Sequence, residues 1–348
     1  MKFLFVGSEK NLDLDRIGGI ESVMRELISF LVRQGNKVEI LLINDDKKDK
    51  KVFITENGDV PIFIMKKSEA RKYILGNFDV INFLQSPFEN PFFALRFFLM
   101  KKIKHTLAVK LYFTFPTVNN IDIQQKLKLK FLIDKTLVFS KRMENKLKKI
   151  TKDVTFLYPP VSEYYIKNKR NNRKKEKIEI LFAGRLSRDK GLEIVIDVFK
   201  ELPDSEFSKN IIGYFADKSD EEKYLPRLQN INPDKLEIEE HKNENRERAF
   251  LPLNQYDILL LPYQELGPTL DTPLLILEGL ASGCIIVTSG IEPVSSIEGN
   301  IIFVKNFTES SQFIDAIKRI KNPESTRVAS DFSSETFGEK YLKFLGLE

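Results

Sequence analysis

The sequence has a single cysteine, Cys284, and only two histidines, His105 and His241. One cysteine excludes an internal disulfide and a cysteine metal cluster, and such scarcity is typical of a protein in a reducing compartment. Zinc sites in proteins are built mainly from cysteine and histidine, so none can be recognised here. The sequence therefore gives no sign of a disulfide framework or of a zinc centre.

Long apolar runs and an excess of one charge are also missing. No stretch reaches the roughly 18 uncharged apolar residues that a membrane span needs, and the apolar run before Glu9 is too short for a signal peptide. The 55 basic and 50 acidic side chains give a net charge of only +5, which argues against a nucleic-acid partner. We expect a cytoplasmic protein that binds no nucleic acid.

The 348 residues alternate short apolar runs with helix-length amphipathic segments, a pattern typical of parallel sheets covered by helices. Two of the runs, residues 2–7 and 179–184, close on a glycine, and each begins its own series. Between the series, residues 166–177 are strongly basic and almost free of apolar side chains. We interpret them as an interdomain connection, the alternative being an external loop within one domain. The sequence thus predicts an α/β protein of two Rossmann-like, doubly wound domains facing a cleft, with boundaries at 1–165 and 178–330. Further strands are expected near residues 37–43, 80–84, 108–115, 136–139, 154–157, 210–214, 235–238, 258–261, 285–288 and 301–304.

A pair of glycines, Gly18 and Gly19, precedes a run with apolar residues at helical spacing. Paired glycines let backbone amides approach a ligand closely, and the helix dipole favours an anion at that end. The alternative is a simple turn. Neither first strand is followed by the G-x-G-x-x-G fingerprint of dinucleotide binding, which argues against a nicotinamide dehydrogenase.

Two cations, Arg185 and Lys190, follow the strand that ends at Gly184. An arginine can hold phosphate oxygens with a fork of donors, while a lysine adds a mobile point charge, so the pair suits a diphosphate. The alternative is a solvated loop with ordinary surface cations.

An apolar helix is predicted to begin at Pro273 and to end at Gly283, with a buried strand after it. Its only carboxylate, Glu278, lies among leucine and isoleucine residues. Desolvating a carboxylate costs several kcal/mol unless it is paired or hydrogen-bonded, so we expect a partner or a ligand for Glu278. A ribose diol would suit it, and exposure on a helix face is the alternative.

Six segments of the sequence together resemble a known family: GGIESVMREL, YPPVS, FAGRLSRDKGLE, YDILLLPY, TPLLILEGLASGCIIVTS and FSSETFGEKYLKFL. Their order and approximate spacing, over nearly the whole chain, are similar to those of the family-4 group of retaining glycosyltransferases, which have the GT-B fold. The resemblance implies a hexosyltransferase that moves a sugar from a nucleotide-sugar donor to a glycan or lipid-linked acceptor. The domain of residues 1–165 would bind the acceptor, joined by a helix from residues 331–348 that crosses back onto it, and the domain of residues 178–330 would bind the donor.

The resemblance also implies roles for single residues. Arg185 and Lys190 would hold the donor diphosphate and act in catalysis, and Glu278 would bind the nucleotide ribose. Two cations and a helix dipole can take over the role of a metal at a leaving phosphate, so we expect neither metal nor cofactor. The other donor-binding residues that it implies are Gly18, Gly19, Gly184, Asp271, Thr272, Pro273 and Leu274.

Two positions depart from the family's pattern. The family has a glutamate eight positions before Glu278, where this sequence has Leu270 followed by Asp271, and residues 113–116 stand where many members carry a histidine. These departures support an alternative function, a catalytically silent GT-B subunit that binds a nucleotide sugar or a partner glycosyltransferase. A nucleotide-sugar epimerase of the same fold is a second alternative, but the scarcity of histidine argues against it.

Residues 92–100 are apolar nearly all round a predicted helix, and Lys101, Lys102 and Lys104 follow directly. Such a helix is usually buried, so one interpretation is a core helix of the first domain. The other is that an aromatic face with Phe97 and Phe98 enters a lipid interface while the lysines meet anionic head groups. The second interpretation predicts a peripheral enzyme at the inner face of the membrane, with an anionic membrane surface as a partner.

Overall fold

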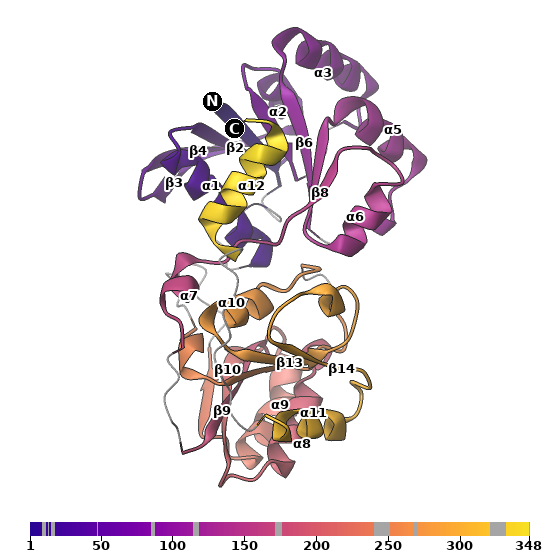
Figure 1. Ribbon diagram of the computed structural model, residues 1–348. Helices are drawn as coiled ribbons and strands as arrows, with labels where there is room; N and C mark the ends of the chain where they lie inside the picture. The colour runs from indigo at the N-terminus through magenta and orange to yellow at the C-terminus, as the bar shows by residue number, and fades with distance from the viewer. Residues whose placement is uncertain are drawn as a thin grey trace. The chain divides into compact units, whose positions relative to one another are not determined.

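The computed structural model describes residues 1–8, 12, 14, 18–46, 48–84, 88–113, 118–170, 176–239, 251–266, 270–320 and 332–347. The chain divides into two compact units, one of Met1–Pro160 with Ser334–Glu348 and one of Val161–Ser333 (Figure 1). Each unit contains one sheet of mostly or entirely parallel strands with helices packed on it. The predicted α/β class with two parallel sheets is confirmed.

The first unit is built on an eight-stranded sheet with the order β3-β4-β2-β1-β5-β6-β7-β8. Its first strand, β1, lies inside the sheet between β2 and β5 and is buried over five of its six residues, as a parallel strand covered on both faces should be. Every neighbouring pair is parallel except β3 with β4. The strands are β1 (Lys2–Gly7), β2 (Lys37–Ile43), β3 (Asp49–Thr55), β4 (Gly58–Met65), β5 (Val80–Phe83), β6 (Leu107–Tyr112), β7 (Lys135–Val138) and β8 (Val154–Phe156).

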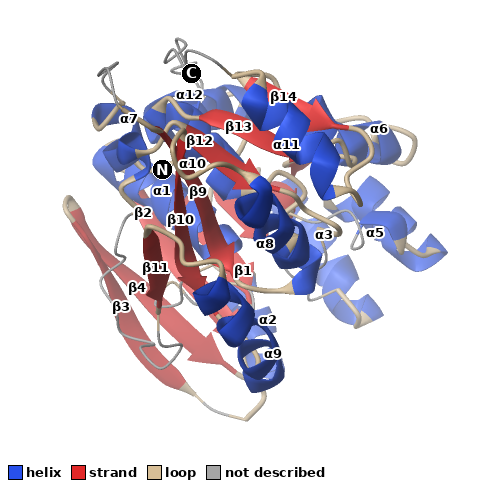
Figure 2. Cartoon of the chain, turned by 90° about the horizontal axis from the view of Figure 1, so that it is seen from below, coloured by secondary structure: helices blue, strands red, loops and turns tan. Residues whose placement is uncertain are grey.

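The hairpin of β3 and β4 was not predicted. The strands pair antiparallel around a two-residue connection, with Thr55 opposite Gly58, and Figure 2 shows them as a long pair at the lower left. The Lys50 and Lys51 side chains are exposed on the outer strand, where charge hinders pairing with another sheet. Most of β3 is exposed on both faces, so it lacks the alternation of apolar residues by which the other strands could be recognised.

The helices of the first unit include one from the far end of the sequence. Helix α12 packs against α1 (Figure 1), and the Tyr341 hydroxyl donates a buried hydrogen bond of 2.6 Å to Asn82 Oδ1 on β5. Gly338 permits the close packing, because a Cβ at this position would lie 2.2 Å from Cδ1 of the buried Phe30 ring on α1. The helices are α1 (Gly19–Arg33), α2 (Lys67–Ile74), α3 (Pro91–Lys104), α5 (Ile123–Leu132), α6 (Lys141–Leu147) and α12 (Ser334–Leu345).

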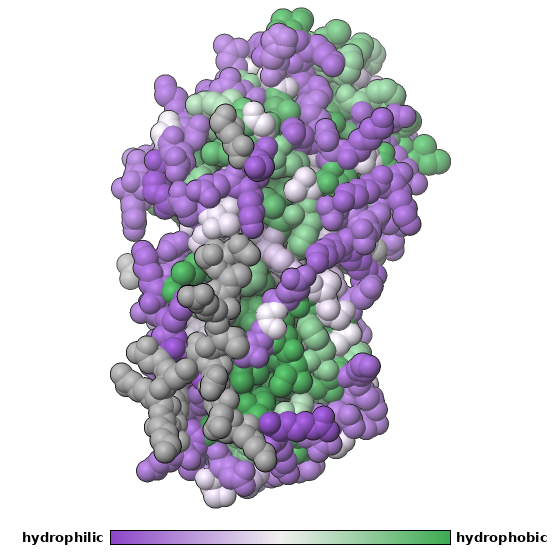
Figure 3. Space-filling model, in the orientation of Figure 1, coloured by the Kyte–Doolittle hydropathy of each residue, from purple (hydrophilic) through white to green (hydrophobic). Residues whose placement is uncertain are grey.

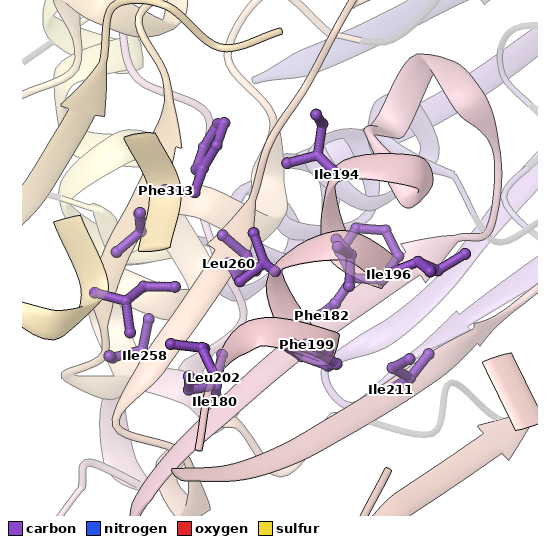
Figure 4. Close-up of a cluster of buried hydrophobic side chains, with 14 of the residues drawn as sticks. Ile180, Phe182, Ile194, Ile196, Phe199, Leu202, Ile211, Ile258, Leu260 and Phe313 are labelled. Carbon is purple, nitrogen blue, oxygen red and sulfur yellow. The ribbon is translucent and has the colours of Figure 1, made fainter. Parts of the chain in front are cut away.

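The second unit is built on a six-stranded, all-parallel sheet with the order β11-β10-β9-β12-β13-β14. Figure 4 shows its core, a buried cluster that includes Phe199 of α8, Ile180 and Phe182 of β9, and Ile258 of β12. The strands are β9 (Ile178–Arg185), β10 (Phe207–Tyr214), β11 (Lys235–Ile238), β12 (Ile258–Leu261), β13 (Ile285–Ser289) and β14 (Ile301–Val304). The helices are α7 (Glu163–Lys167), α8 (Leu192–Glu201), α9 (Lys218–Asn230), α10 (Leu274–Ser282) and α11 (Ser310–Lys318).

The basic segment of residues 166–177, interpreted from the sequence as an interdomain connection, is in part built into the second unit. Arg170 is buried, and its Nη1 lies 2.8 Å from the Asp257 carboxylate, which is buried too. Such a pair joins the segment to the strand β12 that follows Asp257. Residues 171–175 lie outside the described part of the chain. Among the described residues, no helix is both long enough and apolar enough to span a membrane.

Candidate functional site

The strand order of the second unit marks one place in its sheet for a ligand. The chain moves from β9 to β10 and β11 on one side and then returns to β12 on the other side of β9. After β9 the chain continues toward β10 on one side, and after β12 it continues toward β13 on the other side, so the two loops diverge from neighbouring strand ends. Ligands of doubly wound folds bind at the carboxyl ends of the strands at such a switch point.

The loop after β9 is held against the loop after β12. The backbone amides of Gln264 and Glu265 donate to the carbonyl of Asp189, at 2.9 and 3.2 Å. Gly191, at φ +81°, begins α8, and a Cβ there would lie only 1.9 Å from the Pro262 carbonyl oxygen. Only glycine fits this position. The two loops thus form one hydrogen-bonded surface at the carboxyl ends of the central strands.

Arg185 and Lys190 lie on this surface with a carboxylate between them. The Arg185 guanidinium contacts Asp189 Oδ2 directly, and Lys190 Nζ lies 3.8 Å from the same oxygen. The Ser187 hydroxyl donates to Asp189 Oδ1 at 2.6 Å. Burial raises the pKa of Asp189, but the Ser187 hydrogen bond and the two cations outweigh it, so its net pKa lies below the ordinary value. Asp189, which we did not predict, already occupies the two cations with one negative charge.

Lys190 is mostly withdrawn from solvent. Its Nζ lies 5.0 Å from the centroid of the Tyr263 ring, and the residue is 9% exposed. Desolvation is the main cause of a pKa of about 8 for Lys190, below the ordinary value; the charge of Asp189 opposes this shift and the charge of Arg185 adds to it. An anion bound here would stabilise the protonated form of Lys190 and raise its pKa.

Helix α10 brings Glu278 to the same region. As predicted, the helix begins after Pro273 and ends at Gly283, which has φ +85°. Leu275, in the first turn, has its Cδ2 3.9 Å from the place of a Cβ on Gly184, so the helix start lies against the end of β9. Glu278 is 6% exposed, which excludes the alternative of an exposed helix face.

Tyr263 lies close enough to both Glu278 and Asp189 for their charges to act on its hydroxyl, and its ring also lies near Lys190. Burial raises the pKa of the Tyr263 hydroxyl, and the charges of Glu278 and Asp189 raise it further, so both carboxylates act on this side chain. The second unit thus brings together Arg185, Lys190 and Glu278, three of the predicted site residues, with Tyr263 among them. Asp271 and Thr272 are buried just before the helix, and Leu274 is half-buried in its first turn.

Gly18 and Gly19 lie in the first unit, at the start of α1 after β1. The Glu21 side chain lies beside Gly18, with its Oε2 2.2 Å from the place that a Cβ on Gly18 would take, so a larger residue does not fit there without moving Glu21. The Ser22 hydroxyl also donates to the Gly18 carbonyl at 2.6 Å. Glu21 lies in the first turn of α1, where the helix dipole favours an acidic residue.

Of the two histidines, only His105 lies in the described part of the chain. His105 ends α3 in the left-handed conformation, at φ 55°, and His241 lies outside the described residues. Phe113, where related sequences were expected to carry the histidine motif, is buried and stacks on Phe139 at a centroid distance of 4.5 Å. Within the described ranges, no three or more His, Cys, Asp or Glu side chains are grouped as a metal site would need.

Residues 165–333, almost the whole second unit, match the family model described as glycosyl transferases group 1. The second unit belongs to this family. The resemblance recognised in the sequence is therefore confirmed at the level of the glycosyltransferase family. No curated protein matches the chain as a sequence relative.

Solved structures of glycosyltransferases are similar to this chain over its full length. The glycosyltransferase from Rickettsia africae ESF-5 has a TM-score of 0.70 at 15% identity, with 99% of this chain and 98% of that chain covered. The lipopolysaccharide outer core galactosyltransferase WaaB in its apo form has a TM-score of 0.66 at 15% identity, with 99% of each covered. Anabaena Alr3699/HepE in complex with UDP and glucose has a TM-score of 0.62 at 11% identity, also with 99% of each covered. At these identities the likeness shows the fold, which is GT-B.

Proposed function

We propose that the chain is a retaining hexosyltransferase that moves a sugar from a nucleotide-sugar donor to a glycan or lipid-linked acceptor. The observation that carries the proposal is the pair of cations, Arg185 and Lys190, fixed at the switch point of a glycosyl transferases group 1 domain beside the start of α10. The name of one similar structure records UDP and glucose, and that of another records UDP-glucose, which supports a nucleotide-sugar donor.

The residues of this site suit the departure of a nucleoside diphosphate. As the bond from the anomeric carbon to the phosphate oxygen breaks, negative charge develops on that oxygen and the sugar becomes oxocarbenium-like. Arg185 and Lys190 would stabilise the oxygen, and each preorganised donor can contribute roughly 3 to 4 kcal/mol at such a centre. The acceptor hydroxyl attacks from the same face and gives its proton to the departing phosphate. Since two cations and a helix N-terminus neutralise the leaving group, we propose that the reaction needs no metal.

Glu278 and Asp189 have distinct roles in this proposal. Glu278 would accept hydrogen bonds from the ribose diol, which explains why a carboxylate lies buried in an apolar helix. Asp189 would keep Arg185 and Lys190 in place before the donor arrives, and the donor diphosphate would then compete for them. The remaining donor contacts would come from Gly184 and from the segment before α10. We place the reaction in the cytoplasm, where the buried thiol of Cys284 stays reduced.

Donor affinity should depend on the protonation of Lys190. With a pKa of about 8 in the free protein, Lys190 loses its charge as the pH rises through that value. Because kcat/KM reports the free enzyme, we expect kcat/KM for the donor to fall by about tenfold per pH unit above pH 8. In Lys190→Arg the side chain stays charged, so the fall should move to higher pH. An alkaline limb that is the same in both proteins would show that another group titrates.

A panel of nucleotide sugars tests the proposed function directly. The full chain is incubated with UDP-, GDP-, ADP- and TDP-sugars, with and without a strong chelator, and the released nucleoside diphosphate and free sugar are measured. We expect slow hydrolysis of one donor, unchanged by the chelator, with the first sugar released in the donor's own anomeric configuration by NMR.

Other outcomes of the panel identify the alternatives. Binding of a nucleotide sugar without hydrolysis in the presence of acceptor extracts would favour the silent subunit, which is supported by the buried Leu270 in place of a glutamate. Conversion of one nucleotide sugar into its epimer would identify an epimerase. Activity lost with the chelator and restored by magnesium or manganese would contradict the metal-free reaction.

A further inference from the structure

Two neighbouring helices of the first unit, α3 and α5, each expose large apolar side chains. On α3 they follow helical spacing at Phe92, Leu95, Leu99 and Ile103, and on α5 they recur every four residues at Ile123, Leu127 and Phe131. Phe92, Ile103 and Ile123 are the most exposed of them, at 78, 77 and 75%. In Figure 3 hydrophobic surface gathers over α3 and α5, at the upper right. We name these seven residues the apolar face.

The opposite side of the same helices builds the core, so the apolar face is not needed for packing. Phe97 is fully buried, with its ring 4.9 Å from that of Phe88, and Leu129 and Leu132 are buried on α5. The interpretation as a core helix is therefore confirmed for one side of α3, and the interpretation as a lipid-facing helix stays a prediction for the other side. The choice of Phe97 as a lipid-facing residue was wrong, because it is a core residue.

The lysines expected to meet lipid are also reassigned. Lys101 is buried, with its Nζ 2.7 Å from Asp134 Oδ1, and Lys104 donates to the carbonyls of Leu75 and Gly76. Of the three lysines after the apolar run, only Lys102 both is exposed and lacks such a bond among the described residues. Most of the positive charge beside the apolar face therefore comes from other lysines, which line a hollow next to α5.

The hollow beside α5 has a volume of about 490 Å³ and shares Ile123 and Leu127 with the apolar face. Four lysines line it: Lys126 and Lys130 from α5, Lys146 from α6, and Lys149 just after α6. In the described part of the chain, no carboxylate forms an ion pair with any of the four. Helices α3 and α5 together contain seven Lys or Arg residues and no Asp or Glu. We name the four residues the lysine pocket.

We propose that the apolar face and the lysine pocket form a docking surface for a bilayer of anionic phospholipid. The apolar side chains would enter the boundary of head groups and acyl chains, and the lysines would bind head-group phosphates. A bilayer fits better than a protein partner, because the core of a protein interface is depleted in charge, whereas here lysines alternate with the apolar residues along one helix. Large exposed apolar surfaces on a folded unit mark sites of this kind.

The proposal can be tested without any donor or acceptor, so its failure would leave the proposed transferase function unaffected. Because the sequence has no tryptophan, a single introduced tryptophan reports its own surroundings. Leu95→Trp should show a blue-shifted emission when vesicles of phosphatidylcholine with 30% phosphatidylglycerol are added. Ile54→Trp, at a 77% exposed position on β3 in the same unit, is the matched control and should not shift. Equal shifts, or none, would overturn the proposal.

Co-sedimentation with the same vesicles measures the contributions of both parts. We expect Phe92→Ser with Phe131→Ser to weaken vesicle binding at least tenfold, while Val52→Ser with Ile54→Ser, which removes two exposed apolar residues from β3, leaves it unchanged. Lys126→Ala with Lys130→Ala should weaken binding and reduce its salt dependence, in contrast to Lys37→Ala with Lys66→Ala. Circular dichroism confirms that each variant is folded.

Two outcomes would overturn the proposal. One is absence of wild-type binding to anionic vesicles at low salt. The other is wild-type self-association in sedimentation velocity that Phe92→Ser with Phe131→Ser abolishes, without any vesicle binding, because the occupant would then be a second copy of the chain.

Discussion

Replacing Arg185 by alanine is expected to lower turnover at saturating donor by about 10² to 10³-fold. The guanidinium lies at the switch point of the second unit, where it would stabilise charge that appears only as the phosphate leaves. The part of the interaction gained in the transition state lowers turnover, and the part already made with the diphosphate of the bound donor should raise the Michaelis constant as well. Steady-state kinetics on the donor found in the nucleotide-sugar panel would measure this effect.

The neighbouring Arg188 supplies a matched control. It lies in the same loop, but its side chain is exposed, so Arg188→Ala removes an equal charge and should change turnover little. Lys190→Ala should cause a loss similar to that of Arg185→Ala, and the double variant should lose less than the product of the two, because the residues act on one leaving group. Wild-type turnover in Arg185→Ala would refute the assignment of this phosphate site.

The substitution Gly338→Ala should destabilise the first unit by about 3 kcal/mol, because an added methyl group has no space. Its Cβ would lie 2.2 Å from the Phe30 ring, which is buried beneath α12 and cannot turn away without disturbing α1. Urea unfolding followed by circular dichroism should show the transition of this unit at a lower concentration. Since the chain has two units, two transitions must be fitted.

Two further variants separate overpacking from other effects of the change. Glu339→Ala, at the next and exposed position of α12, raises helix propensity without any contact and should leave the midpoint nearly unchanged. Phe30→Leu should restore part of the stability lost in Gly338→Ala, so the two changes should be non-additive. If Gly338→Ala cost as much stability in the Phe30→Leu background as in the wild type, steric overlap with the ring would not be the cause.

The sequence predicted the buried strands well for a physical reason. A parallel strand covered on both faces must be apolar throughout, so β9 and β12 appear as short apolar runs with clear ends. The edge strand β3 follows no such rule, because its partner lies on one side and solvent on the other. The Asn-Gly pair at the start of β4, Asn57 and Gly58, is the signal in the sequence that indicates the hairpin.

The charged residues of the site could be predicted from the sequence, but the ion pairs between Asp189 and the two cations could not. Charged residues beside apolar segments indicate a partner or a ligand, because burying an unpaired charge is costly; this applies to Arg185, Lys190 and Glu278. Asp189 did not stand out, since an acidic residue in a polar loop is ordinary in sequence. Its position between the two cations depends on how the loop after β12 binds the carbonyl of Asp189, a long-range contact that no local pattern encodes.

The same limitation explains the mixed outcome for α3. Its sequence is apolar on nearly every side, so periodicity could not tell which residues face the core. The answer depends on α5, which covers only part of α3 and leaves Leu95 and Leu99 uncovered. For a helix that is apolar on nearly every side, the packing of neighbouring elements decides which residues are buried and which are exposed.

The position of α12 determines when the first unit can be completed during synthesis. Asn82 of β5 receives its hydrogen bond from Tyr341, and the whole second unit lies between them in the sequence. At about 5 to 20 residues per second, the ribosome would need roughly 10 to 40 s after Pro160 to deliver this helix. During that interval the surface of α1 around Phe30 is not yet covered by α12. The second unit is a continuous segment, so it can fold as soon as it leaves the ribosome. The unit that is translated first is therefore the one that matures last.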